Sequence, residues 1–79
     1  MTQDEALQIV MRQADKIGLD PMMEFHHAQR AIVEYCPDRS RPGRVSDRLA
    51  WVLYFRGELG RMEVQVDDRK GEILSVVRE

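Results

Sequence analysis

The feature that most constrains this chain is a strict alternation of apolar and polar residues over RMEVQVD, followed by the turn sequence DDRKG. Successive side chains of a β-strand point to opposite faces, so this alternation predicts one buried face and one solvent face. Asp67 favours the start of a turn, and Gly71 stands where a short hairpin needs a positive φ angle. The two strands are expected at about 61–67 and 72–78, joined by a turn that contains Asp67, Asp68 and Gly71.

The acidic residues of this hairpin, Asp67, Asp68 and Glu72, raise the alternative of a metal site or a catalytic site. A calcium loop needs several more oxygen ligands at alternating spacing, and the basic residues between these carboxylates would repel a cation. Glu63 and Asp67 are four residues apart on one strand face, roughly 13 Å, which is too far for a retaining glycosidase pair. The sequence therefore favours a structural hairpin.

Two further stretches have the composition of strands. RLAWVLYFRG, over about 48–57, alternates large aromatic and aliphatic residues between two faces. AIVEY favours a strand over about 27–36, which Pro37 ends. A helix that groups Met22 with Phe25 stays open as the alternative for the start of this segment.

The N-terminal stretch TQDEALQIVMRQADKIG predicts a helix over about 3–17 with both ends marked. Thr2 and Glu5 have the spacing of a capping box, in which each side chain bonds the backbone N–H of the other. Gly18 is placed for the left-handed residue that follows a last helical turn. Apolar residues between these signals recur at three- and four-residue steps and so form one face.

The predicted order is one helix followed by four strands with short links, which favour antiparallel neighbours. A chain of 79 residues has room for one small domain. We therefore expect a single α+β domain over residues 1–79, with the N-terminal helix packed on a four-stranded antiparallel meander. Its expected core consists of Leu7, Val10, Met11, Ala14, Trp51, Leu53, Phe55, Val64 and Val66.

The stretch AWVLYFRGELGRMEVQVDDRKGEIL, preceded by DEALQIVMRQA, resembles the PepSY domain, a small bacterial module. The resemblance covers the helix and residues 50–74, about half of the chain, and it implies a helix against an antiparallel sheet with no catalytic residues to transfer. It also implies a role in restraining peptidases, or in sensing and interaction, generally outside the cytoplasm. The Arg-rich insert at 37–48 departs from that pattern. The matching positions are Ala6, Trp51, Val52, Val64, Val66, Asp67, Gly71, Glu72 and Ile73.

Charge and hydropathy argue against nucleic acids and membranes as partners and bear on where the protein is located. The net charge of −2 argues against general binding of nucleic acids, which needs a basic surface. No apolar run approaches the roughly 18 residues that a membrane helix needs. The acidic start, MTQDEALQ, lacks the basic and apolar regions of a secretory signal. We therefore expect a cytoplasmic protein that does not contact membranes.

His26, His27 and Cys36 are the residues that could support zinc binding or nucleophilic chemistry. Neighbouring residues of a strand point to opposite faces, so the two histidines are poor joint ligands for a site that needs four. Asp38 would raise the pKa of the Cys36 thiol and disfavour a nucleophile. A single cysteine also excludes an internal disulfide. We expect no metal, no cofactor and no enzymatic activity.

The loop at 37–47 is the candidate partner-binding segment, because guanidinium groups bind carboxylates and phosphates in bidentate fashion. A solvated loop is the alternative. The sequence thus predicts a small non-enzymatic protein-binding or regulatory module, whose partner is another protein or a second copy paired along an exposed sheet edge. A peptidase inhibitor or regulator, by family analogy, and a self-associating structural protein are the alternatives. The candidate binding residues are Arg39, Arg41, Arg44 and Arg48.

Overall fold

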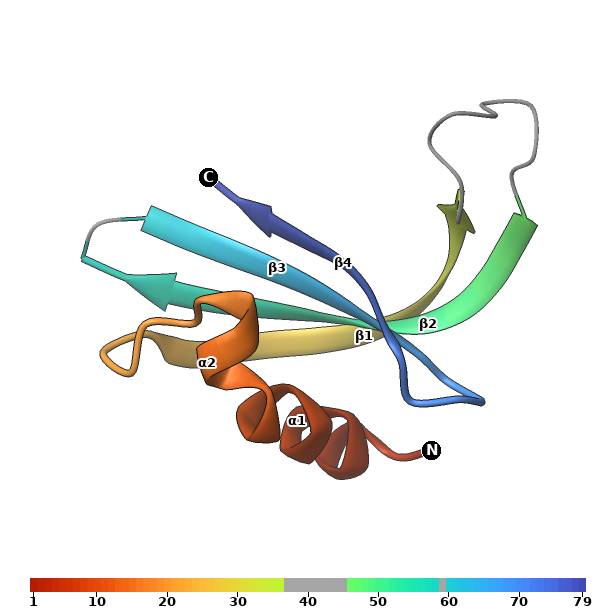
Figure 1. Cartoon of the computed structure of the whole chain (residues 1–79), viewed down its shortest axis with the longest axis horizontal. Helices are drawn as coiled ribbons and strands as arrows, with labels where there is room; N and C mark the ends of the chain where they lie inside the picture. The colour runs from red at the N-terminus through yellow and green to blue at the C-terminus, as the bar shows by residue number, and fades with distance from the viewer. Residues whose placement is uncertain (37–45, 59) are drawn as a thin grey trace.

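The computed structural model describes residues 1–36, 46–58 and 60–79, and arranges them in two layers (Figure 1). A short helical segment lies against one face of a four-stranded sheet with strand order β1-β2-β3-β4, in which all neighbours are antiparallel. The predicted α+β architecture is confirmed. The elements are α1 (Gln3–Arg12), α2 (Ala14–Ile17), β1 (Glu24–Tyr35), β2 (Ser46–Gly57), β3 (Gly60–Asp67) and β4 (Ile73–Arg78).

The helical segment begins at a capping box. The Thr2 hydroxyl accepts the Glu5 N–H at 3.2 Å, and the Glu5 carboxylate accepts the Thr2 N–H at 3.0 Å. These hydrogen bonds from Thr2 lower the pKa of Glu5. The single helix predicted over 3–17 is instead divided at Gln13, whose backbone leaves helical geometry at φ −106° and ψ 13°. α2 then ends at Gly18, with φ 72°.

β1 begins earlier than predicted, at Glu24 rather than at residue 27, so the helical alternative for this segment is wrong. A β-bulge interrupts its pairing with β2 between Phe25 and His27. Phe25 stays opposite Phe55 on the helix side, with ring centroids 5.8 Å apart. β2 also begins earlier than predicted, at Ser46 rather than at about residue 48, and residues 37–45 of the predicted loop lie outside the described ranges.

The core lies between α1 and the helix-facing side of the sheet. Ala6 and Val10, one turn apart, are both fully buried. Met11 was expected beside them but is 55% exposed, because consecutive helical residues differ by about 100° in direction. Leu7, Ala14 and Trp51, also expected in the core, are half-buried at its margin. The buried cluster consists of Ala6, Val10, Leu19, Leu53, Phe55, Met62, Val64 and Val66.

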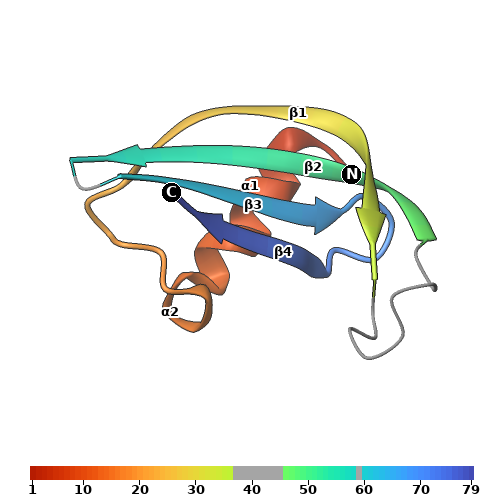
Figure 2. The same ribbon diagram turned by 90° about the horizontal axis from the view of Figure 1, so that it is seen from above.

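One part of the sheet extends past this core. The strand register of β3 with β2 begins at Ala50, so residues 46–49 of β2 are in register with residues 32–35 of β1, and beyond β3 the Asp68 N–H donates to the Leu49 carbonyl at 3.0 Å. We call these two short segments the distal arm. In Figure 1 the arm continues beyond the helix and bends away from it. Figure 2 shows α1 passing behind the sheet toward the β4 side, where α2 lies.

Candidate interaction surface

The Asp67 carboxylate stabilises the hairpin turn by accepting hydrogen bonds from its backbone. Its Oδ1 accepts the N–H of Arg69 at 2.8 Å and of Lys70 at 3.0 Å, and its Oδ2 accepts a bond from Arg48 at 3.3 Å. Asp67 is 3% exposed, and the N–H of Lys70 is the largest influence that lowers its pKa. Gly71 completes the turn with φ 69°. This carboxylate is therefore a structural group.

Asp68 belongs to a second polar cluster, on the helix side of the sheet. Its carboxylate lies 3.3 Å from the amino group of Met1 and 3.1 Å from Arg30. Burial alone would raise the pKa of Asp68, but the amino group and Arg30 outweigh that effect and lower it. Trp51 donates its indole N–H to the Met1 carbonyl at 3.1 Å, and Arg30 lies 5.6 Å over the Trp51 ring. The cluster fastens β1 to the start of the chain.

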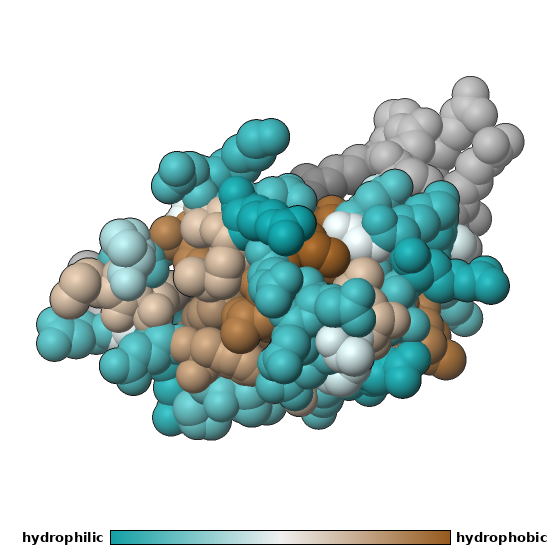
Figure 3. All heavy atoms as spheres, turned by 90° about the horizontal axis from the view of Figure 1, so that it is seen from below, coloured by the Kyte–Doolittle hydropathy of each residue, from teal (hydrophilic) through white to brown (hydrophobic). Residues whose placement is uncertain are grey.

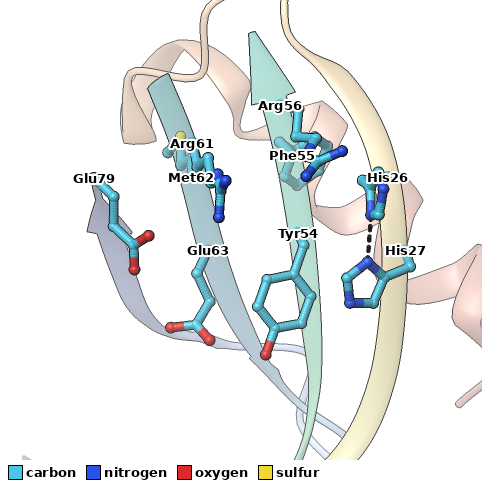
Figure 4. Close-up of a pocket in the computed structure, with 9 residues that line it drawn as sticks. All are labelled: His26, His27, Tyr54, Phe55, Arg56, Arg61, Met62, Glu63 and Glu79. Atoms are coloured by element: carbon cyan, nitrogen blue, oxygen red, sulfur yellow. Dashed lines mark hydrogen bonds between the residues drawn. The ribbon is translucent and has the colours of Figure 1, made fainter. Parts of the chain in front are cut away.

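The sequence predicted that the two histidines point to opposite faces of the strand, and this prediction is wrong. The bulge in β1 brings His26 Nδ1 within 2.5 Å of His27 Nδ1, and the His27 ring stacks on Tyr54 at 4.4 Å (Figure 4). Burial raises the pKa of Tyr54, and a hydrogen bond to Glu63 adds to that effect. Loss of water contact and then the charge of Arg56 lower the pKa of His26.

These side chains line a hollow of about 150 Å³ on the side of the sheet opposite the helix. The histidine bond needs a neutral acceptor ring, so the bonded pair carries at most one positive charge. Arg56 and Arg61 face each other across β2 and β3, while Glu63 and Glu79 offset their charge. Among the described residues of this lining, Tyr54 carries a hydroxyl group, and none carries a thiol or an amine. The charged groups of the lining thus balance one another, and its residues offer no catalytic arrangement.

No metal centre forms within residues 1–36, 46–58 and 60–79, where no three His, Cys, Asp or Glu side chains converge. Of the four candidate arginines, Arg39, Arg41 and Arg44 lie outside these ranges. Arg48 stands in β2, where it bonds Asp67 and lies 5.8 Å over the Tyr35 ring. Its guanidinium thus stabilises the arm by binding Asp67 and contacting the Tyr35 ring.

The outer edge of β1 is the longer of the two sheet edges that the described residues form. Within residues 1–36, 46–58 and 60–79, β1 is 12 residues long and pairs with β2 alone, so none of these residues forms a strand along its other side. The edge of β4 differs, because the Arg78 guanidinium there donates to the carbonyl of Ile17 at the end of α2. Ile32 of β1 is 72% exposed, and its cross-strand partner Leu49 is 42% exposed. On the helix side, hydrophobic surface lies between polar side chains (Figure 3).

The sequence predicted an exposed sheet edge but not which edge. It placed Arg30, Ile32 and Glu34 on one strand face but did not single them out as an interaction surface. The signal that could have found them is the RAIVE pattern, in which an apolar residue stands between opposite charges at alternate positions.

Comparison of the chain with protein-family models, with curated proteins and with solved structures found no match. In the described ranges, none of the helices has the length and apolar character needed to cross a membrane.

Proposed function

We propose that this chain is a small non-enzymatic module that binds an extended protein segment along the free edge of β1. The observation that carries the proposal is the exposure of Ile32, at 72%, on a 12-residue strand whose outer edge pairs with no other described strand. Edge strands bind partners by main-chain hydrogen bonds, and side chains at alternate positions add specificity. Exposed apolar side chains beside such an edge favour association.

The polar clusters support a binding role over a catalytic one. Asp67 is occupied by the turn, and Asp68 binds Arg30 and the N-terminal amino group. His27 is stacked on Tyr54. Each of these titratable groups therefore has a structural contact that accounts for its position.

The resemblance to the PepSY domain stays a prediction, as does the cytoplasmic location. A helix against an antiparallel sheet is an architecture that unrelated proteins share, so it does not choose among functions. Regulation of a peptidase rests on that resemblance alone, and the edge of β1 is the more specific basis for a proposal.

The test is affinity capture from native lysate with the tagged chain and two variants. Ile32→Lys places a charge on the proposed edge, and Met22→Lys places the same charge at another exposed apolar residue, 81% exposed, away from the distal arm. Both substitutions are expected to leave the fold intact because the side chains are exposed. A partner bound by the wild type and Met22→Lys, but lost from Ile32→Lys, is the expected result. A partner retained by Ile32→Lys would move the binding site elsewhere.

A further inference from the structure

We propose that the partner of the β1 edge is a second copy of this chain, paired antiparallel with Ile32 opposite Ile32. The inference rests on the function proposed above and names the occupant of that same surface. A two-fold axis through this pair would join two four-stranded sheets into one continuous sheet. The interface would be isologous, since the same strand contributes from both copies.

The register follows from the arrangement of charge on one face of β1. Arg30, Ile32 and Glu34 are at alternate positions and so share the helix side of the sheet. With Ile32 opposite its counterpart, Arg30 faces the partner's Glu34, and Glu34 faces the partner's Arg30. Opposite charges placed directly across antiparallel strands stabilise the pairing, and each dimer would contain this pair twice.

Within one chain, the residue that faces Glu34 across the sheet does not balance its charge. Its cross-strand neighbour on β2 is Asp47, also acidic, and like charges in this position are unfavourable. Both residues are exposed. An arginine delivered by a second copy would relieve this repulsion.

Arg30 is suited to that contact. Its side chain is 49% exposed, and one of its two terminal nitrogens, Nη2, bonds Asp68 at 3.1 Å. A guanidinium has five N–H donors, so it can bond Asp68 and a partner carboxylate together. Contact with the Trp51 ring further restricts its position.

The apolar side chains fit the same register. Ile32, 72% exposed, would be covered by its counterpart. On the opposite face, Ala31 would lie against the partner's Val33, a small residue beside a larger one. Pairing centred on Arg30 would oppose two arginines, and pairing centred on Ala31 would set Arg30 against Ile32. Of these three registers, only the one centred on Ile32 places each Arg30 opposite a Glu34 and the two isoleucines opposite each other.

The strand also lacks the usual protection of an edge. Residues 24–35 contain neither proline nor lysine, two common ways to prevent edge pairing. The β-bulge lies between Phe25 and His27, at the other end of the strand from the arm. The described residues of the arm therefore contain no bulge that would prevent regular antiparallel pairing.

Cysteine cross-linking tests the register directly. In a Cys36→Ser background, Ile32→Cys would place two thiols on directly opposed residues, within the Cα separation that a disulfide tolerates. Gln29→Cys is the control, because its counterpart would lie six residues along the strand, about 20 Å away. We expect fast oxidation to a covalent dimer for Ile32→Cys and slow oxidation for Gln29→Cys. Equal rates would overturn the register.

Charge reversal tests the same pairing without a covalent bond. Glu34→Arg would oppose arginines at both positions, and we expect the dimer dissociation constant to rise at least about tenfold. An equimolar mixture of Glu34→Arg with Arg30→Glu restores opposite charges in both pairs, so the mixed dimer is expected to form. Analytical ultracentrifugation measures both effects, and circular dichroism checks that each variant is folded.

The outcomes separate this inference from the proposed function. A wild-type chain that stays monomeric at millimolar concentration, while another protein is captured in an Ile32-dependent way, would overturn the homodimer and leave the edge-binding function standing. A chain that neither self-associates nor captures a partner through Ile32 would overturn both. Self-association that Glu34→Arg and Ile32→Lys leave unchanged would assign the dimer to another surface.

Discussion

The helix-covered part of the sheet and the distal arm follow the same alternating sequence pattern but differ in burial. Leu53 and Leu49 lie on one face of β2, yet Leu53 is fully buried and Leu49 is 42% exposed. The difference arises because α1 covers the first region and the arm continues past it (Figure 1). Alternation therefore predicts which face is apolar, whereas the position of the helix decides whether that face is covered by the chain itself.

The largest expected effect compares these two leucines. Leu53→Ala removes a fully buried side chain and is expected to lower the free energy of unfolding by about 3 kcal/mol, whereas Leu49→Ala should cost less than about 1 kcal/mol. Urea unfolding followed by Trp51 fluorescence measures both, at protein concentrations too low for association. Equal losses would mean that the arm is as well covered in the single chain as the core is.

Asp67 connects the two regions, because its backbone is in the hairpin turn and its carboxylate bonds Arg48 at the end of the arm. Asp67→Asn weakens three hydrogen bonds and is expected to cost about 2 kcal/mol. The measurement is again urea unfolding at neutral pH. Asp15→Asn, which removes the same charge from an exposed helical position, is the control and should be nearly neutral.

The same carboxylate predicts how stability changes in acid. The pKa of Asp67 in the folded chain is lower than its usual value of 3.8. Its stabilising effect is therefore complete above that usual value and is lost as the pH falls through the folded pKa. Melting temperatures measured from neutral pH down to about pH 2 should fall less steeply for Asp67→Asn than for the wild type. Parallel curves would show that other carboxylates cause the acid transition.

A substitution at Gly71 tests the hairpin turn, which lies against α1 in the helix-covered region. Its φ of 69° is unfavourable for residues with a side chain, and an added Cβ would lie 3.0 Å from Ile9 Cδ1. Gly71→Ala is expected to cost about 1–2 kcal/mol. Gly71→Asn meets the same Ile9 contact but tolerates left-handed geometry better, so a smaller loss for Asn would isolate the backbone effect. Thermal unfolding of both variants gives the difference.

Local signals in the sequence predicted much of this fold, because a capping box, a turn glycine and alternation act over a few residues. Met11 was misplaced because the apolar stripe on the helix is wider than the face that the sheet buries. The contact between His26 and His27 was missed because the bulge in β1 has no local signature. The free edge of β1 was not identified because it depends on the strand order and on where α2 lies.

The smallest expected effect concerns the helix that creates the difference between the two regions. Thr2→Ala removes the hydroxyl that caps α1 and is expected to cost about 1 kcal/mol. If α1 can detach before the sheet unfolds, hydrogen exchange should accelerate about fivefold at amides of the covered region, such as Leu53, and remain unchanged at Leu49 in the arm. Gln3→Ala, one residue along on the exposed side of α1, is the control and should leave both rates unchanged. Equal acceleration at Leu53 and Leu49 would instead mean that helix, core and arm open as one cooperative unit. In that case the arm would owe its order to the same core that the helix covers, despite the exposure of its side chains.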